Sequence, residues 1–478
     1  MTQPQLNQRL TSMDASFLYF ERKEAPLHIG GIHVFEGELP YEVFVEHIQA
    51  RMHLLPRYQQ KIIPAPFGVG HPTWERDPDF EVRKHILKAT VDVPGDLDQL
   101  RRLTGRLQSS MLSRDKPLWE MYVVSGMSGN RSALITKVHH AMVDGVSGVD
   151  LLKIVLDMSP NPALPPPPEK AISHPRTDMT TNFIEGLLGS AEESMKSWND
   201  FQKGLLNLTQ TLLKEPSRPF SQSLGSLFPA MAAPVSLLPF NRANSGEQHL
   251  GWNEFSFAEA RAIRAAIGGT VNDVMLTVLS GAMARYVELH GQKTSGRNLR
   301  VMVPVSMRQE EQRGALGNLV SVLPIEIPLD LPDPLERYSH LTKKTGTLKG
   351  ARVAEGINVL TALMGTVPAS MQALMGSLAS TPVPPFNTVC TNVPGPQIPL
   401  YALGRKMIAS YPYVPVGFML GVSCAIFSYN QMLYFGVTAD VNAMPDVDKF
   451  QELLNEAFVE LREAAGVAPI QPLGTKKF

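Results

Sequence analysis

The chain has 478 residues, of which 44% are hydrophobic and 19% are charged, so it can form two or three domains with large cores and is not a disordered scaffold. Its 44 Lys and Arg residues and 45 Asp and Glu residues give a net charge of −1, which argues against nucleic acid as the main partner, because neutralising phosphates needs a basic excess. Two cysteines, Cys390 and Cys424, exclude a disulfide scaffold and a cysteine-based structural zinc site, and they favour a reducing cytoplasm.

The N-terminal segment predicts a mixture of helices and strands. Residues 27–36 are typical of a strand, and Pro40 is a suitable first residue for the helix that follows. A second helix is expected from about Asp96, because leucines recur at helical spacing after it. Strands are expected at 121–124 and 133–140.

The middle of the chain has a different composition. Six prolines between residues 160 and 168 predict a stiff, extended linker, and residues 184–212 have the apolar spacing of a long amphipathic helix. The segment 227–240, LFPAMAAPVSLLPF, carries no charge and contains three prolines. It is expected either to pack as a crossover between two domains or to touch a membrane surface.

The mixed pattern returns after residue 251. Thr270 and Asp273 resemble the two ends of a capping box that opens an apolar helix. The pattern also predicts strands at 299–305 and 320–327, a hairpin of 417–428 with 432–440, and a last helix around 450–461.

A stretch of very low charge covers residues 357–439, where Arg405 and Lys406 are the only charged residues. Prolines interrupt it repeatedly, and a membrane-spanning helix needs about 20 uninterrupted apolar residues. We therefore expect no transmembrane segment here. Core, a tunnel for a lipid substrate or a membrane-facing surface are the remaining interpretations.

These patterns together predict an α/β fold with mixed sheets in two domains. The N-terminal domain is expected at 1–158. A proline-rich linker and helical crossover follow at 159–245, and the C-terminal domain is expected at 246–478.

The segment His139-His140-Ala-Met-Val-Asp144-Gly145 carries the strongest chemical signal. It ends a predicted strand, where neighbouring side chains point to opposite faces, so one histidine can enter a cleft while the other packs inward. An imidazole is the usual group for taking a hydroxyl proton at pH 7. Gly145 permits a backbone turn that other residues resist.

Three interpretations compete for this pair of histidines. A metal site is disfavoured, because adjacent histidines on a strand cannot readily bind one ion and Asp144 would need a third partner. Two packed histidines beside a turn aspartate form a purely structural alternative. A catalytic base is the favoured interpretation, and no metal is expected.

The motif is similar to the HHxxxDG motif of the CoA-dependent acyltransferase superfamily, which includes chloramphenicol acetyltransferases and peptide-synthetase condensation domains. Further segments, in the same order as in the family, resemble bacterial wax ester synthase/diacylglycerol acyltransferases. They are Met13-Asp-Ala-Ser-Phe-Leu18 with Pro26-Leu-His-Ile-Gly30, Lys116-Pro-Leu-Trp119, Val271-Asn-Asp273, Pro304-Val-Ser-Met-Arg308 with Gly317-Asn318, and Asn392-Val-Pro-Gly-Pro396.

The resemblance implies two chloramphenicol-acetyltransferase-like domains and an O-acyltransferase that moves a long-chain fatty acyl group from acyl-CoA to a fatty alcohol or a diacylglycerol. It implies that His140 is the general base, that Asp144 orients the loop through a basic partner, and that Asn272 is functionally important. Acyl-CoA is then a co-substrate, and no permanently bound cofactor is expected.

The chemistry adds a role for Asn272. Direct transfer in a ternary complex forms a tetrahedral oxyanion, which needs preorganised donors, and Asn272 at a helix N-terminus is our candidate. Candidates for substrate binding, each with a structural alternative such as packing, a rigid turn or a solvated surface, are Trp119, Arg308, Asn318, Asn392 and Gly395. Arg308 could instead be the partner of Asp144.

Two alternative functions remain at this point. The chain could acylate another hydroxylated lipid, or it could be a non-catalytic lipid-droplet coat or lipid-binding protein, although a pure binder has no use for an intact HHxxxDG base. The expected location is the cytoplasm, with peripheral association at the inner face of the plasma membrane or at lipid inclusions, where the substrates are.

Overall fold

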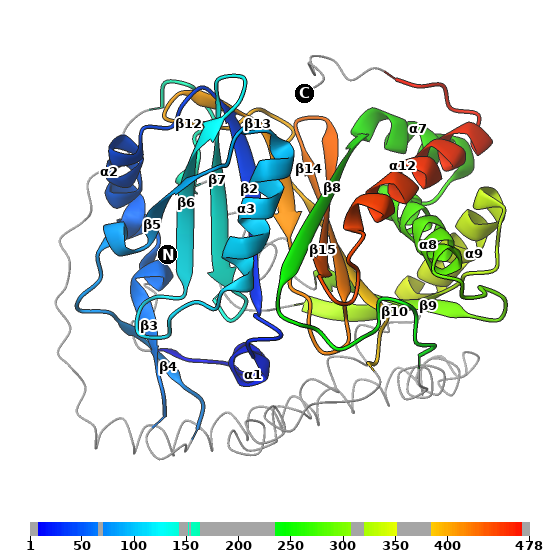
Figure 1. Cartoon of the computed structure of the whole chain (residues 1–478), viewed down its shortest axis with the longest axis horizontal. Helices are drawn as coiled ribbons and strands as arrows, with labels where there is room; N and C mark the ends of the chain where they lie inside the picture. The colour runs from blue at the N-terminus through cyan, green and yellow to red at the C-terminus, as the bar shows by residue number, and fades with distance from the viewer. Residues whose placement is uncertain are drawn as a thin grey trace, which may run out of the picture.

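A computed structural model of the chain describes residues 8–65, 70–142, 152, 154–162, 235–306, 320–350 and 384–470. Two six-stranded sheets form its framework, and helices pack against both of them (Figure 1). A three-stranded sheet of β1 (Gln8–Arg9), β4 (Thr73–Arg76) and β3 (Gln60–Ile63) completes the strands. The expected α/β fold with mixed sheets is confirmed.

The first sheet has the strand order β12-β13-β2-β7-β6-β5, with β5 and β6 parallel and the other pairs antiparallel. The helices of this half are α1 (Ser12–Phe20), α2 (Tyr41–Arg51) and α3 (Leu97–Ser109). The strands are β2 (His28–Glu36), β5 (Ile86–Thr90), β6 (Trp119–Met127), β7 (Arg131–His139), β12 (Tyr401–Ala402) and β13 (Arg405–Tyr413).

The second sheet has the order β10-β9-β11-β14-β15-β8, in which β11 runs parallel to both of its neighbours. Its helices are α7 (Phe257–Ile267), α8 (Val271–Leu289), α9 (Pro334–Gly350) and α12 (Val447–Ala464). The strands are β8 (Gln248–Ser256), β9 (Asn298–Ser306), β10 (Val320–Pro328), β11 (Thr388–Pro394), β14 (Val422–Tyr429) and β15 (Met432–Asp440).

Within the described residues, the helices and strands that the sequence predicted are present, and local signals explain several of their ends. Asp96 caps α3 by accepting a hydrogen bond from the backbone of Gln99, and Thr270 and Asp273 form the complete capping box of α8. The predicted hairpin exists as β14 and β15, but its first strand begins at Val422 instead of residue 417. Residues 417–420 form a tight turn, which the sequence analysis did not predict.

The sequence analysis also missed a strand that the C-terminal part of the chain contributes to the first sheet. Strand β13 comes from the C-terminal third of the chain, yet it pairs antiparallel with β2 in the first sheet. Trp252 of β8 stacks on Tyr411 of β13 with ring centroids 4.3 Å apart. The C-terminal part of the chain therefore supplies a strand to the first sheet, and aromatic packing joins the two sheets. The predicted domain boundaries stay a prediction.

Helix α8 lies in the core of the second half, where most of its residues are buried. Helices α7 and α8 together have the apolar length of a membrane span, but they are bent by 99° at their junction. Within the part of the chain that the structure describes, no single helix is long and apolar enough to cross a membrane.

The predicted linker and crossover lie largely outside the described residues, which resume at residue 235. In the described end of the 227–240 segment, Leu238 and Phe240 are buried, while Leu237 is 43% exposed. This end of the segment therefore packs against the protein, as the crossover interpretation expects.

Candidate active site

The two histidines of the motif occupy different environments at the end of β7. His139 pairs with His28 of β2 and its side chain is buried, whereas His140 is half-buried just beyond the strand. The backbone N–H of His140 donates a hydrogen bond of 2.9 Å to the carbonyl of Leu27. The alternation expected for a strand thus places one imidazole inward and leaves the other accessible.

The imidazole of His140 stacks on a phenylalanine of α1. The ring centroids of Phe17 and His140 lie 4.0 Å apart and the ring planes differ by 10°. A parallel aromatic face at this distance holds the imidazole in one orientation. Phe17 lies in the 13–18 segment that resembles the family, but the sequence analysis gave it no role, because no local pattern relates it to residue 140.

The inner histidine belongs to a buried cluster around Glu21, which follows directly after α1. Nε2 of His139 lies 3.3 Å and Nε2 of His28 3.2 Å from Oε1 of Glu21. The other carboxylate oxygen, Oε2, accepts a hydrogen bond of 3.0 Å from Arg114. The sequence analysis assigned no role to His28 and overlooked Glu21, because neither residue has a spacing that relates it to the motif.

Charge within this cluster follows from its burial and its contacts. Burial alone would raise the pKa of Glu21, but the hydrogen bonds of His139 and His28 outweigh burial and hold the pKa well below its usual range. Burial lowers the pKa of His28 to about 4 despite the nearby carboxylate. Glu21 is therefore ionised and His28 neutral near pH 7.

The tautomer of His139 can be assigned from its neighbours. Its Nδ1 accepts a hydrogen bond of 3.0 Å from the backbone N–H of Ala141. Neutral His139 therefore carries its proton on Nε2, which faces the carboxylate of Glu21. This hydrogen bond also fixes the position of the Ala141 backbone, directly after the two histidines.

A second polar group lies at the N-terminus of α8. Asn272 is the second residue of this helix, and Nδ2 of Asn392, on β11, donates a hydrogen bond of 3.2 Å to Oδ1 of Asn272. The oxygen of Asn272 is thus turned toward Asn392, so its amide nitrogen is the side that can donate elsewhere. A helix N-terminus adds a favourable field for negative charge. The structure brings together two residues that sequence analysis had proposed separately.

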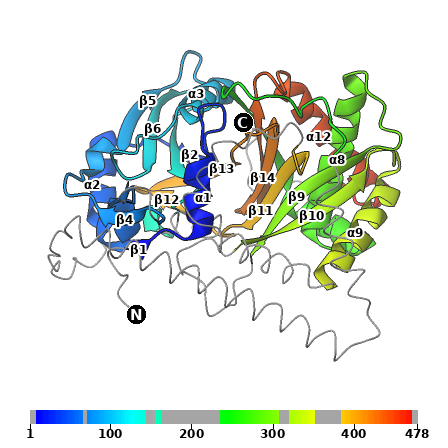
Figure 2. The same cartoon turned by 90° about the horizontal axis from the view of Figure 1, so that it is seen from below.

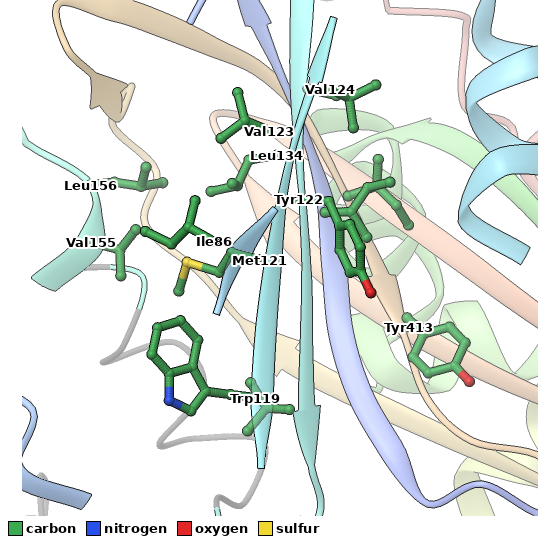
Figure 3. Packing of buried hydrophobic residues seen from close by; sticks show 14 of the residues in the cluster. Ile86, Trp119, Met121, Tyr122, Val123, Val124, Leu134, Val155, Leu156 and Tyr413 are labelled. Atoms are coloured by element: carbon green, nitrogen blue, oxygen red, sulfur yellow. The ribbon is translucent and has the colours of Figure 1, made fainter. Parts of the chain in front are cut away.

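Two other candidates have clear packing roles. Trp119 is 1% exposed, its indole N–H donates to the carbonyl of Tyr58, and its ring stacks on His85 at 4.5 Å. Figure 3 shows it on the same side of the strands as Met121. A Cβ on Gly395 would lie 2.4 Å from Ser428 O, so this position requires glycine. Neither observation favours contact with substrate.

Four predicted site residues lie outside the described ranges: Asp144, Gly145, Arg308 and Asn318. Within the described ranges, no three His, Cys, Asp or Glu side chains are placed to hold a metal ion. Cys390 and Cys424 are free and buried, and burial raises the pKa of Cys390 to about 12. Such thiols are poor nucleophiles at neutral pH.

Comparison with known families gives two matches that together cover most of the chain. The model of the wax ester synthase/diacylglycerol acyltransferase catalytic domain matches residues 10–275. The model of the C-terminal domain of the same family matches residues 316–462. "Probable diacyglycerol O-acyltransferase tgs2" of Mycobacterium tuberculosis (strain ATCC 25618 / H37Rv) is 30% identical to the chain, and the match covers 95% of the chain and 98% of that protein.

Solved structures support the fold. A wax ester synthase/diacylglycerol acyltransferase from Marinobacter aquaeolei VT8 superposes with a TM-score of 0.66 at 21% identity, covering 96% of this chain and 100% of the other. The first condensation domain of the calcium-dependent antibiotic synthetase gives a TM-score of 0.61 at 14% identity, covering 99% and 98%. These likenesses confirm the two-domain fold expected from the sequence.

Proposed function

Since the chain belongs to the wax ester synthase/diacylglycerol acyltransferase family, we propose that it transfers a long-chain fatty acyl group from acyl-CoA to the hydroxyl group of a fatty alcohol or a diacylglycerol. The observation that carries this proposal for the site is the environment of His140. His140 is half-buried, its imidazole stacks on Phe17, and it directly follows β7, which suits a positioned general base.

The transfer needs one proton acceptor. His140 removes the proton of the acceptor hydroxyl while the oxygen attacks the thioester carbonyl of acyl-CoA. The tetrahedral intermediate then collapses, the carbon–sulfur bond breaks, and His140 returns the proton to the sulfur of CoA. The products are an ester and free CoA, and no acyl-enzyme is formed, in keeping with the buried cysteines.

The negative charge of the intermediate requires a donor. Asn272 supplies it in this proposal, because its side-chain oxygen already accepts from Asn392 and the amide nitrogen is the side left to face the substrate. The positive end of α8 adds to the stabilisation. Asn392 then acts as a positioning residue that fixes the orientation of the Asn272 amide.

Residues that contact the motif hold the proposed base in position. His139 and Glu21 hold the end of β7 in place, and Ala141 is bonded to His139. For Asp144 we keep the role of orienting the motif loop through a basic partner. Arg308 remains a candidate for that contact or for binding the CoA phosphates, and Asn318 remains a candidate for substrate binding.

The substrates are nearly insoluble in water, so we place the enzyme at the surface of a membrane or of lipid inclusions, on the cytoplasmic side. The buried side chains of Leu238 and Phe240 cannot enter a bilayer in this conformation, which removes them from the anchor first expected in the 227–240 segment. Leu237, which is 43% exposed, remains available.

One assay tests the proposed function. Purified protein is incubated with palmitoyl-CoA and either hexadecanol or dipalmitoylglycerol, and free CoA and neutral lipid are both measured. Ester formation at the rate of CoA release supports the transfer. CoA release without ester would indicate hydrolysis, and lipid binding without either product would indicate a non-catalytic lipid-binding protein.

A further inference from the structure

Helix α1 has two apolar faces: one is buried in the core, and the other packs against it only in part, through Phe17. Ala15 and Leu18 are buried with Asp14 on the inner face. Met13, Phe17 and Phe20 follow at positions i, i+4 and i+7, so they form a second stripe along the helix, and all three are only half-buried. Figure 1 shows α1 below the two sheets, and in the view from below it covers the region where the two halves meet (Figure 2).

The second stripe leads from His140 to the other half of the molecule. Phe17 stacks on His140 at 4.0 Å, and Phe20 lies one helical turn further along. Phe20 meets Phe418 in an edge-to-face contact with centroids 6.1 Å apart. Phe418 belongs to the turn between β13 and β14, so a row of phenylalanine rings runs from this turn to the candidate base.

The turn that carries Phe418 is unfavourable for the residues in it. Gly417 and Leu420 exchange two backbone hydrogen bonds, and the two central residues, Phe418 and Met419, have φ angles of 53° and 68°. Turns with positive φ at both central positions are normally made by Asn and Gly, because a bulky side chain is strained there. The chain nevertheless places two large apolar side chains at these positions, both half-buried.

The turn is also held firmly in place. A Cβ on Gly417 would lie 2.5 Å from the Cβ of Ala25, so the turn packs closely against the segment that precedes β2. The guanidinium of Arg22 lies over the Phe418 ring, 5.8 Å from its centroid. A strained turn kept in a fixed position beside a row of half-buried rings indicates a binding function.

We propose that Met13, Phe17, Phe20 and Phe418 form an alkyl wall, a surface that holds the hydrocarbon chain of a lipid substrate and leads its reactive end to His140. The inference rests on the proposed function and adds the subsite for the chain. An alkyl chain is the ligand that fits, because the wall offers ring faces and a thioether and its strained turn gains from burying apolar area.

Both the acyl chain of acyl-CoA and the chain of the acceptor are alkyl groups, so the experiment has two arms. In one arm, transfer from palmitoyl-CoA to octanol, decanol and dodecanol is compared. In the other arm, octanoyl-, decanoyl- and dodecanoyl-CoA are compared with one fixed alcohol. On the wild type we expect kcat/KM to rise by up to about fourfold per added methylene in the arm whose chain lies on the wall.

Phe418→Asn is the decisive variant. Asparagine tolerates the positive φ, so the variant should melt at the same temperature as the wild type or higher, while the ring is lost. The increase of kcat/KM with chain length should become smaller in one arm of the experiment. That arm identifies the alkyl chain that lies on the wall. Phe20→Leu, which shortens the wall from the helix side, should flatten the same arm in part.

The matched control is Leu403→Asn. Leu403 also has a positive φ, 50°, but it lies in the turn between β12 and β13, and its change should leave both chain-length series as in the wild type. If Phe418→Asn and Phe20→Leu keep the wild-type slopes in both arms, the alkyl wall is wrong although the transferase stands. If the wild type transfers the acyl group to no acceptor, the proposed function is wrong, and the alkyl wall, which rests on it, is wrong with it.

Discussion

Glu21 and His139 face each other in the interior of the first half, with Oε1 of the carboxylate 3.3 Å from Nε2 of the imidazole. His139 uses its other nitrogen to accept the N–H of Ala141. A buried carboxylate therefore fixes the tautomer and orientation of one motif histidine, while the adjacent His140 stays accessible. The two neighbouring histidines thus occupy distinct environments, and replacing each of them should have a distinct effect.

The first prediction separates these tasks. His140→Ala should lower kcat by about 10²–10⁴-fold with an unchanged melting temperature, because it removes a positioned base and little packing. His139→Ala should lower the melting temperature, because it leaves a carboxylate facing a cavity. Steady-state kinetics and thermal melts of both variants check this. Wild-type turnover by His140→Ala would exclude it as the base.

The second prediction concerns Glu21. Glu21→Gln removes the charge that Arg114 and the two inner histidines are arranged around, and it should lower the free energy of unfolding by about 3 kcal/mol. The matched control is Glu42→Gln, whose side chain is 56% exposed and pairs with Arg83, and which should unfold like the wild type. Urea denaturation measures both. Equal stability of the two variants would show that the buried cluster is not a structural support.

The third prediction tests the amide pair at the N-terminus of α8. Asn272→Ala should lower kcat by about 10²-fold or more, as expected for loss of an oxyanion donor. Asn392→Ala should lower kcat by about tenfold and leave KM for palmitoyl-CoA unchanged, because Asn392 acts through Asn272. The double variant should then be no slower than Asn272→Ala. Independent, multiplying losses would mean that Asn392 contacts the substrate directly.

The fourth prediction is a loss of stability in mild acid. Burial lowers the pKa of His28, His33, His71 and His85 to about 4, below the value near 6.5 of an unfolded chain. Between these values the unfolded state binds more protons, so the free energy of unfolding must fall as the pH drops from about 6.5 to 4, on the order of 1–3 kcal/mol per histidine. Glu21 stays ionised throughout this window.

Melting curves between pH 7 and pH 4.5 check this dependence. His33→Gln should flatten the curve, because it removes one buried imidazole and keeps a group that can bond to Ser410. A melting temperature that is constant across the window would contradict the assignment of these histidines as neutral.

The fifth prediction concerns lipid surfaces. The protein should float with neutral liposomes, and salt should change the bound fraction little, because the net charge is −1. Leu237→Ser should reduce flotation, whereas Val43→Ser, at a similarly exposed position of α2, should not. Absence of flotation by the wild type would exclude adsorption.

Much of the local structure was determined by the sequence alone. The caps at Asp96 and Thr270 and the alternation around His139 involve residues within a few positions of one another, so their signals can be read directly. The same holds for the HHxxxDG motif, whose residue types indicated a catalytic base, while its resemblance to a known family implied acyl transfer.

Only the tertiary structure decided what surrounds the motif. Arg114 and Glu21 are separated by 93 positions, and His33 and Ser410 by 377, and such pairs leave no local pattern in a single sequence. Strand β13 was missed for the same reason, because its partner β2 lies at the other end of the chain. Residue type and spacing determine which group can do the chemistry, but the packing of distant segments decides which residues hold it in place.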